Sequence, residues 1–215
     1  MRAVATRMRA GPAPVGQDMK NGVVRVLGSV LLIVLSARGA PAATPAGLAD
    51  VPARIDRIVA LLRAPGLSHE QRRRAVLAQA QPAFDWHVMA RTAMGPTWRE
   101  RTPAQRAEFT RLFRALVERT YLERVLRYHD EKVVYGREAV QGDTALLPTQ
   151  IVRPRRAPIS IDYELLRRGD RWFIIDVLIE HVGLVSNYQS QFAAILGRSS
   201  YRGLVAAIQA RIARG

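Results

Sequence analysis

Residues 170–196 read DRWFIIDVLIEHVGLVSNYQSQFAAIL, and this stretch decides how the rest of the chain is organised. Its first part, residues 172–179, is apolar apart from Asp176 and rich in β-branched and aromatic side chains. Such a segment is typical of a central strand that is buried on both faces. Apolar side chains then recur at spacings of four, four and three residues, at Leu184, Tyr188, Phe192 and Ile195. This spacing predicts an amphipathic helix that folds back over a sheet.

Helical patterns fill the chain before this stretch. The longest predicted helix opens at Thr102, because Pro103 suits the first helical position and Gln105 completes a capping box with Thr102. A last helix is expected around residues 204–212. Helical spacing of apolar residues, with Ser68 as an N-cap, predicts earlier helices over residues 48–64, 69–81 and 84–94.

Beyond His129 the pattern changes from helical to alternating. Four strands are predicted, over residues 132–137, 144–152, 159–167 and 171–179. Their short connections make the pairs antiparallel. Helices segregated to one side of such a sheet indicate the α+β class, here a twisted antiparallel four-stranded sheet wrapped by helices, with extra helices at the N-terminal end.

The first part of the chain has the pattern of a secretory signal. A short basic segment, residues 19–25, precedes an apolar run over residues 26–37, and Ala40 and Ala42 supply small residues for a signal peptidase. The run is too short to cross a bilayer, which needs roughly 20 residues. We therefore expect residues 1–42 to be a signal peptide and N-terminal extension that is removed, and residues 43–215 to form a single domain. The sequence leaves the start open between Met1 and Met19.

Charge is strongly positive and unevenly distributed. The chain carries 33 Lys and Arg against 18 Asp and Glu, a formal net charge of +15, and most of the excess remains after residue 42. Such a balance attracts phospholipid headgroups, acidic proteins or nucleic acid, and composition does not choose among them. Arg153, Arg155 and Arg156, in a predicted strand connection, could contact phosphates or an acidic docking surface. The alternative is an ordinary charged turn.

Motifs for catalysis and cofactor binding are mostly absent. The sequence contains no GxGxxG, GxxxxGK[ST] or GxSxG motif, and no cysteine. The histidines have no metal-ligand spacing, so we expect neither a metal site nor a cofactor. Asp176 and His181 could form an acid/base pair, but a hydrogen-bonded Asp176 and a turn residue at His181 are favoured, because buried carboxylates are usually paired.

Two long segments resemble the MlaC family of periplasmic phospholipid-binding proteins, also called toluene-tolerance or Ttg2 auxiliary proteins. They are FDWHVMARTAMGPTWRERTPAQRAEFTRLFRALVERTYLERVL (84–126) and ISIDYELLRRGDRWFIIDVLIEHVGLVSNYQSQFAAIL (159–196). The tract WFIIDV followed by SNYxSQF is the most specific part. Where the family usually has Gly, Ser and Arg, this chain has His181, Gly183 and Gln189.

The resemblance implies a non-enzymatic carrier in the periplasm. Such a carrier shuttles diacyl phospholipid between an outer-membrane lipoprotein complex and an inner-membrane ABC transporter with an MCE-domain ring, which maintains outer-membrane lipid asymmetry. The implied fold is a cone similar to nuclear transport factor 2. A monomer is expected, with no nucleic-acid partner.

On this hypothesis, acyl chains lie between the sheet and the helices. Which alternate set of residues 172–179 faces them stays open, because both sets are apolar. The residues expected to contact the tails are Phe109, Phe113, Leu116, Tyr121, Ile161, Tyr163, Phe173, Ile175, Val177, Leu184, Tyr188 and Phe192.

Two other functions stay open from the sequence. One is a carrier of hopanoids or another lipid, and the other is a small-ligand enzyme on the same fold that uses Asp176 and His181. Lipid identity, transport direction and oligomeric state are not set by the residues.

Overall fold

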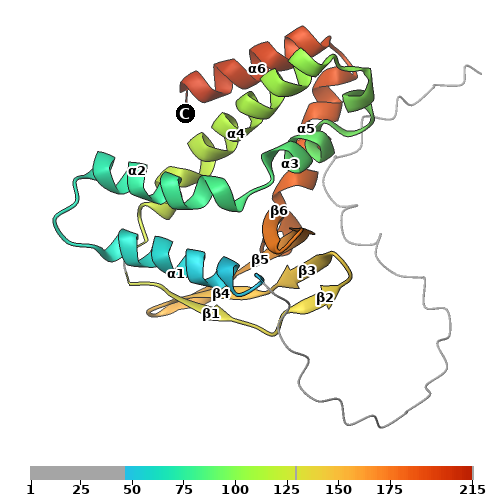
Figure 1. Cartoon of the computed structure of the whole chain (residues 1–215). Helices are drawn as coiled ribbons and strands as arrows, with labels where there is room; N and C mark the ends of the chain where they lie inside the picture. Colours follow the sequence, from blue (N-terminus) through green and yellow to red (C-terminus); the bar gives the residue numbers. More distant parts are fainter. Residues whose placement is uncertain (1–46, 129, 215) are drawn as a thin grey trace, which may run out of the picture. The chain divides into compact units, whose positions relative to one another are not determined.

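Helices make up most of the domain, and their ends follow the local sequence signals (Figure 1). The computed structural model describes residues 47–128 and 130–214, so the predicted signal peptide lies outside the described residues. Residues 43–215 form one compact unit. The helices are α1 (Asp50–Arg63), α2 (His69–Ala80), α3 (Trp86–Met94), α4 (Pro103–Val125), α5 (Leu184–Leu196) and α6 (Tyr201–Arg214), with 3-10 turns η1 (Gln81–Ala83) and η2 (Gly95–Glu100).

Reciprocal side-chain caps start α2 and α4. The Ser68 hydroxyl accepts a hydrogen bond from the Gln71 backbone N–H, and Thr102 does the same for Gln105; in both cases the glutamine side chain accepts from the backbone of the cap residue in return. These reciprocal bonds satisfy N–H groups that the first turn of a helix leaves without partners. The predicted capping box at Thr102 is therefore confirmed, as is the N-cap at Ser68.

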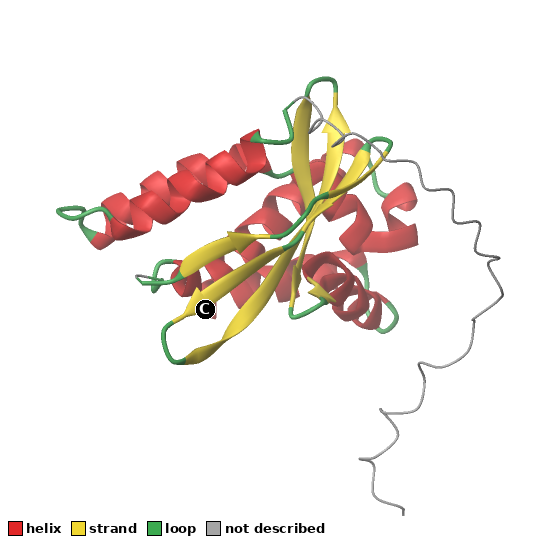
Figure 2. Cartoon of the chain, turned by 90° about the horizontal axis from the view of Figure 1, so that it is seen from below, coloured by secondary structure: helices red, strands yellow, loops and turns green. Residues whose placement is uncertain are grey.

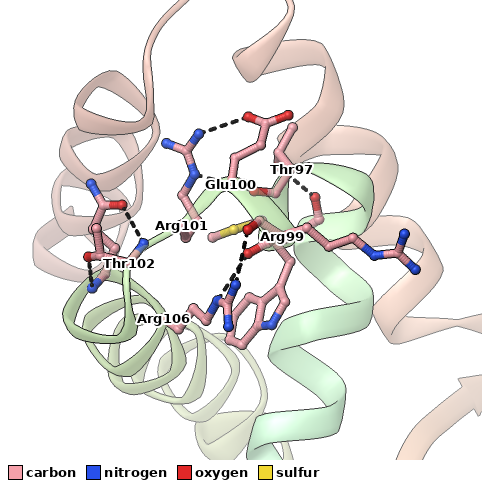
Figure 3. Close-up of polar contacts among 9 residues, drawn as sticks. Thr97, Arg99, Glu100, Arg101, Thr102 and Arg106 are labelled. Atoms are coloured by element: carbon pink, nitrogen blue, oxygen red, sulfur yellow. Dashed lines mark hydrogen bonds and ion pairs between the residues drawn. The ribbon is translucent and has the colours of Figure 1, made fainter.

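The junction between α3 and α4 is held by one arginine (Figure 3). Arg106 donates hydrogen bonds to the carbonyls of Trp98, at 3.1 Å, and Arg99, at 3.0 Å. The Arg106 guanidinium also lies over the Trp98 ring, 5.7 Å from its centroid. These contacts tie the first turns of α4 to η2 and fix the direction in which the long helix leaves.

The sheet has seven strands among the described residues, so the predicted count of four is wrong. They are β1 (Lys132–Tyr135), β2 (Ala139–Gln141), β3 (Thr144–Leu147), β4 (Thr149–Arg153), β5 (Arg156–Arg168), β6 (Arg171–Ile179) and β7 (Val182–Gly183), and all pair antiparallel. The predicted strand 144–152 is divided at Pro148, which cannot donate a backbone hydrogen bond. The predicted connection 153–158 is a tight hairpin instead, because Arg155 adopts φ 57° and β5 begins directly after it.

The central strand is β5, not the segment 172–179 that the sequence favoured. β5 pairs with β4 and then β3 along one edge and with β6 along the other. Figure 2 shows the consequence: the strands run together through β5 and fork into two arms. The outer edge of β6 carries only the short β7 and a bridge between Ile174 and Phe84, where the Asp85 N–H donates to the Ile174 carbonyl at 2.9 Å.

A bulge explains why β6 looked buried on both faces. Glu164 pairs with Asp176 but Leu165 pairs with Ile174, so Ile175 is an extra residue in the ladder. An extra residue exchanges the faces of the two alternate sets. Trp172 and Ile174 before the bulge and Val177 after it therefore belong to the same apolar cluster. The residues that face the sheet core belong to one alternate set before the bulge and to the other set after it. Both alternate sets of β6 are therefore apolar, although the strand buries one face in this core.

Three hydrophobic clusters hold the domain together. The helical core joins α3, α4, α5 and α6 around Phe109, Phe113 and Tyr188. The sheet core places Leu48 and Val51, at the start of α1, against β3, β5 and β6. The third cluster, the α1–α2 core, consists of Leu62, Val76, Leu122 and Leu126. The first and last turns of α1 thus belong to different cores.

Asp85 links the helical layer to the sheet, which gives a test of the fold. Its carboxylate accepts from the Val88 N–H at 3.0 Å, pairs with Arg168 at 2.7 Å, and is only 11% exposed. We expect Asp85→Ala to lower the free energy of unfolding by about 2 kcal/mol, from the lost cap and ion pair. Urea denaturation measures this. The control Asp143→Ala breaks a more exposed pair with Arg167 and should cost less than about 1 kcal/mol. Equal losses in both variants would contradict this role.

Candidate functional site

An apolar cavity lies between α1, the end of α4 and the strands β1 and β4. Its volume is about 30 Å³. Val59 and Leu62 come from α1, while Val133 and Ile151 are register partners on β1 and β4 and so share one face of the sheet. The complete lining consists of Val59, Leu62, Arg63, Tyr128, Glu131, Val133 and Ile151.

A wider groove adjoins this cavity at the C-terminal end of α1. The groove measures about 560 Å³ and shares Leu62 and Arg63 with the cavity. Arg63, Arg72 and Lys132 supply positive charge to it, and Asp130 supplies the one carboxylate in its lining. An apolar cavity therefore opens beside a groove with an excess of positive charge.

Arg72 shapes the groove by closing the end of α1. Its guanidinium donates hydrogen bonds to the Leu61 carbonyl at 2.7 Å and to the Ala64 carbonyl at 3.0 Å. The last carbonyls of a helix lack partners within the helix, and a cation there also interacts favourably with the helix dipole. Arg72 on α2 thus fixes where α1 ends and where the groove begins.

Tyr135 fastens α1 to the sheet. Its hydroxyl donates a hydrogen bond to the Asp56 carboxylate at 2.7 Å and lies 3.3 Å from the Pro52 carbonyl. Burial raises the pKa of the Tyr135 hydroxyl, and the bond to Asp56 raises it further. The hydroxyl therefore stays protonated and remains a donor at physiological pH. This contact connects the first half of α1 to the end of β1.

The predicted tail-contacting residues separate into two groups. Six lie in the helical core and are at most 5% exposed: Phe109, Phe113, Leu116, Leu184, Tyr188 and Phe192. Their rings pack against one another, for example Phe113 edge-on to Tyr188 with centroids 5.5 Å apart. The structure brings these six together, but in a closed cluster away from the cavity.

The other six are only partly buried: Tyr121, Ile161, Tyr163, Phe173, Ile175 and Val177. Tyr163 and Val177 are register partners on β5 and β6 and pack against the sheet core, on the face that meets α1. Burial raises the pKa of the Tyr163 hydroxyl to about 12, yet the side chain keeps some accessible surface. Phe173 lies under the Arg171 guanidinium, whose carbon is 4.9 Å from the ring centroid.

The residues that line the cavity are absent from the predicted set. Val59 and Leu62 belong to the helical stripe of α1, and Val133 and Ile151 follow strand alternation. These patterns mark them as inward-facing. The patterns do not show where a cavity remains between α1 and the sheet, because the position of a cavity depends on how elements far apart in the chain pack together.

Asp176 and His181 do not form an acid/base pair. The Asp176 carboxylate accepts hydrogen bonds from the Val185 N–H at 2.9 Å and the Val177 N–H at 2.7 Å. His181 is in a turn, 81% exposed, and lies 3.8 Å from the Asp162 carboxylate. The expectation of a hydrogen-bonded aspartate and a turn histidine is confirmed.

The same corner contains two departures from the family pattern, of which the structure explains the one at Gly183. His181 has φ 66°, a conformation that glycine adopts without strain, and the family usually has glycine there. Gly183 is the N-cap of α5 but supplies no side-chain bond. A Cβ at Gly183 would lie 2.8 Å from the Asp176 carboxylate, so the glycine leaves room for Asp176 to cap α5 instead.

Residues 47–128 and 130–214 contain neither a cluster of metal-ligating side chains nor a candidate transmembrane helix. No three His, Cys, Asp or Glu side chains there lie close enough together to hold a metal ion. None of the helices in these ranges combines the length and the apolar character that crossing a membrane requires.

The fold and these contacts define a class: an α+β domain with an apolar cavity beside a cationic groove, which is the layout of a binding protein. A family model described as MlaC protein matches residues 53–210, and the chain therefore belongs to the MlaC family. This confirms the resemblance drawn from the sequence.

A solved structure supports the fold. It is the phospholipid-binding protein from Ralstonia solanacearum in complex with a phospholipid, and its sequence is 24% identical to this chain. The match covers 80% of this chain and 98% of that chain, with a TM-score of 0.70. The two proteins therefore share the arrangement of helices and sheet.

The capping role of Asp176 predicts a pH effect on stability. Burial raises the pKa of this carboxyl, while the hydrogen bonds from Val185, Val177 and Leu184 lower it; the net shift is upward. Because the folded pKa exceeds the unfolded one, ionisation above about pH 4 should reduce the free energy of unfolding. Asp176→Asn keeps an acceptor oxygen for the N–H groups and should remove this part of the pH dependence.

Urea denaturation between about pH 3 and pH 7, the range over which carboxyl groups titrate, measures the effect. The variant Asp176→Ala also loses the capping acceptor. It should be less stable than Asp176→Asn by about 1 kcal/mol at every pH. Parallel pH profiles for the wild type and Asp176→Asn would show that burial of this carboxyl has no energetic effect.

Proposed function

We propose that this protein binds a phospholipid, with the phosphate in the cationic groove and the acyl chains entering through the apolar cavity. The observation that carries the proposal is the shared wall between them, formed by Leu62 and Arg63. Each buried methylene contributes about 0.8 kcal/mol, so acyl chains favour the apolar side of such a wall. Membership of the MlaC family and the phospholipid-bound relative support the same ligand class.

The tail site must expand to accept a lipid. A cavity of about 30 Å³ has room for roughly one water molecule, whereas ligand pockets measure about 300–1,000 Å³. The sequence led us to expect room for acyl chains between the sheet and the helices, and the apolar cavity found there is too small to hold one. We infer that α1 moves away from the sheet when lipid enters, because α1 forms one wall of the cavity and its hydrogen bond to β1, from Tyr135 to Asp56, is exposed.

Such a movement would uncover the partly buried apolar residues of the sheet. Tyr163 and Val177 face the α1 side, and Ile161 precedes Tyr163 by two positions on the same strand face. We propose that these three, together with Tyr121, contact the tails. The other six predicted residues, which are fully packed in the helical core, would then support the site without contacting lipid.

Carriage between membranes requires no catalysis. Because a bilayer buries acyl chains as well as the protein does, transfer between them can be close to neutral, and contacts at a docking partner can decide its direction. We propose a monomeric periplasmic carrier that is exported by its signal peptide, with residues 1–42 removed during export. Its partners would be an inner-membrane ABC transporter with an MCE-domain ring and an outer-membrane lipoprotein complex, as the family resemblance implies. A cone like that of nuclear transport factor 2 stays a prediction.

Lipid retention tests this proposal. We expect phospholipid to co-purify with residues 43–215, and Val133→Arg to reduce the amount at least tenfold, because the new charge would lie in the cavity wall. Mass spectrometry of extracted lipid measures the amount. Val140→Arg, at a side chain that is 42% exposed on β2, is the matched control and should retain a normal load. Hopanoid in the extract would identify another lipid class, and an empty wild type would contradict the proposal.

The Tyr135 contact predicts a kinetic effect. Tyr135→Phe removes the hydrogen bond to Asp56 that holds α1. A hydrogen bond to a charged group contributes about 1.5 kcal/mol, so lipid release should accelerate about tenfold. Transfer of a fluorescent phospholipid from the protein to acceptor vesicles measures the rate. Tyr128→Phe changes a cavity-lining residue with no such bond among the described contacts and should leave the rate within about twofold. Equal rates in all three proteins would exclude movement of α1 as the limiting step.

A further inference from the structure

The β4–β5 hairpin combines exposed positive charge with exposed apolar surface. Its end contains Arg153, Arg155 and Arg156, and no acidic residue occurs anywhere from Pro148 to Ile161. Arg155 and Arg156 are exposed. Among the described contacts neither makes an ion pair, whereas other arginines of the domain pair with carboxylates at Glu70, Glu100, Glu118, Asp143 and Asp85.

Arg153 behaves differently from its two neighbours. Its guanidinium donates to the Ala157 carbonyl at 2.7 Å, and its Nε is buried without a hydrogen-bond partner. Arg153 therefore folds back along its own hairpin. Arg155 and Arg156 are the cations that the hairpin presents to an outside surface. The positive φ of Arg155, 57°, is what allows the turn to be this tight.

Exposed valines lie beside these cations. Val134 is 50% exposed and Val152 is 36% exposed. Lys132 is the register partner of Val152, and Gln150 is the register partner of Val134, so all four side chains share one face of the β1–β4 pair. The opposite face carries Val133 and Ile151, which line the cavity.

This placement puts the surface at the rim of the tail site. The end of the hairpin, the start of β1 and the C-terminal end of α1 lie at the same end of the domain (Figures 1 and 2). Lys132 belongs both to this surface and to the groove. A lipid that leaves a bilayer beneath the hairpin would therefore have a short route past Lys132 into the groove.

We propose that the face formed by Lys132, Val134, Val152, Arg155 and Arg156, the hairpin face, contacts the surface of an anionic phospholipid bilayer. The inference rests on the proposed phospholipid function and adds where the protein meets its source of lipid. Arginine and lysine gain about 1 kcal/mol each near an anionic membrane surface. Valine side chains gain from contact with the interfacial apolar region as well. A protein partner would instead need acidic groups and would not depend on lipid charge.

Vesicle sedimentation of residues 43–215 tests the hairpin face. Binding should be measurable on vesicles of phosphatidylglycerol mixed with phosphatidylcholine, and weak on phosphatidylcholine alone. The double variant R155A/R156A should bind the mixed vesicles about 25-fold more weakly. The matched control R198A/R202A removes the same charge from two exposed residues outside the hairpin and should bind within about twofold of the wild type.

The apolar component is tested separately. Val134→Ser should weaken binding to the mixed vesicles by a few fold, while Val140→Ser, at a similarly exposed valine on β2, should not. Equal weakening by R155A/R156A and R198A/R202A would show that only net charge acts and would overturn the hairpin face. Absence of vesicle binding by the wild type would also overturn it, and would favour an acidic protein as the partner.

Lipid analysis of the same preparations separates this inference from the proposed function. If phospholipid co-purifies normally while the hairpin variants bind vesicles like the wild type, the hairpin face is wrong and the lipid-binding function stands. If no phospholipid co-purifies with the wild type, the proposed function itself fails.

Discussion

The position of α1 is the constraint on which the rest of the site depends. Its first turns are buried in the sheet core through Val51, and its last turns in the α1–α2 core through Leu62. One helix therefore has to satisfy two clusters that do not merge. The cavity lies beneath the turns between and beside them, where Val59 meets Val133 and Ile151 across a gap. The cavity thus lies along a helix whose two ends are buried in different clusters.

Local signals predicted most helices correctly, and long-range packing produced the errors. The capping boxes at Ser68 and Thr102 depend on residues three positions apart, so the sequence was sufficient to find them. The central strand was misplaced because a bulge at Ile175 makes both alternate sets of β6 apolar, which imitates burial on two faces. The long strand 144–152 was not divided at Pro148, although proline there removes a donor. The predicted tail contacts stay a prediction; six of the twelve residues lie in the helical core, and an aromatic stripe has the same sequence pattern whether it fills a core or lines a cavity.

Charge is arranged in two different ways on this protein. Many arginines pair with a nearby carboxylate or a backbone carbonyl, as Arg106 and Arg168 do, and these contacts fix junctions between elements. The groove and the β4–β5 hairpin each contain more cations than carboxylates, although Arg72 and Arg153 also bond to backbone carbonyls. A net positive charge spread over solvated faces would attract any polyanion equally. Here the excess positive charge lies beside an apolar cavity. This arrangement favours a ligand that is anionic at one end and apolar at the other.

The division of the buried residues into three clusters affects which parts of the protein have to move when the cavity opens. The helical core contains no residue of α1 or α2, so the proposed movement of α1 leaves the packing within that core unchanged. Opening is then a local event that costs only part of the global unfolding free energy, because it disrupts only some of the buried contacts. Under the proposed function, lipid would therefore enter and leave through a local opening and not through an unfolded, aggregation-prone state. The helical core would thus keep its structure during each cycle of lipid uptake and release, while α1 changes position.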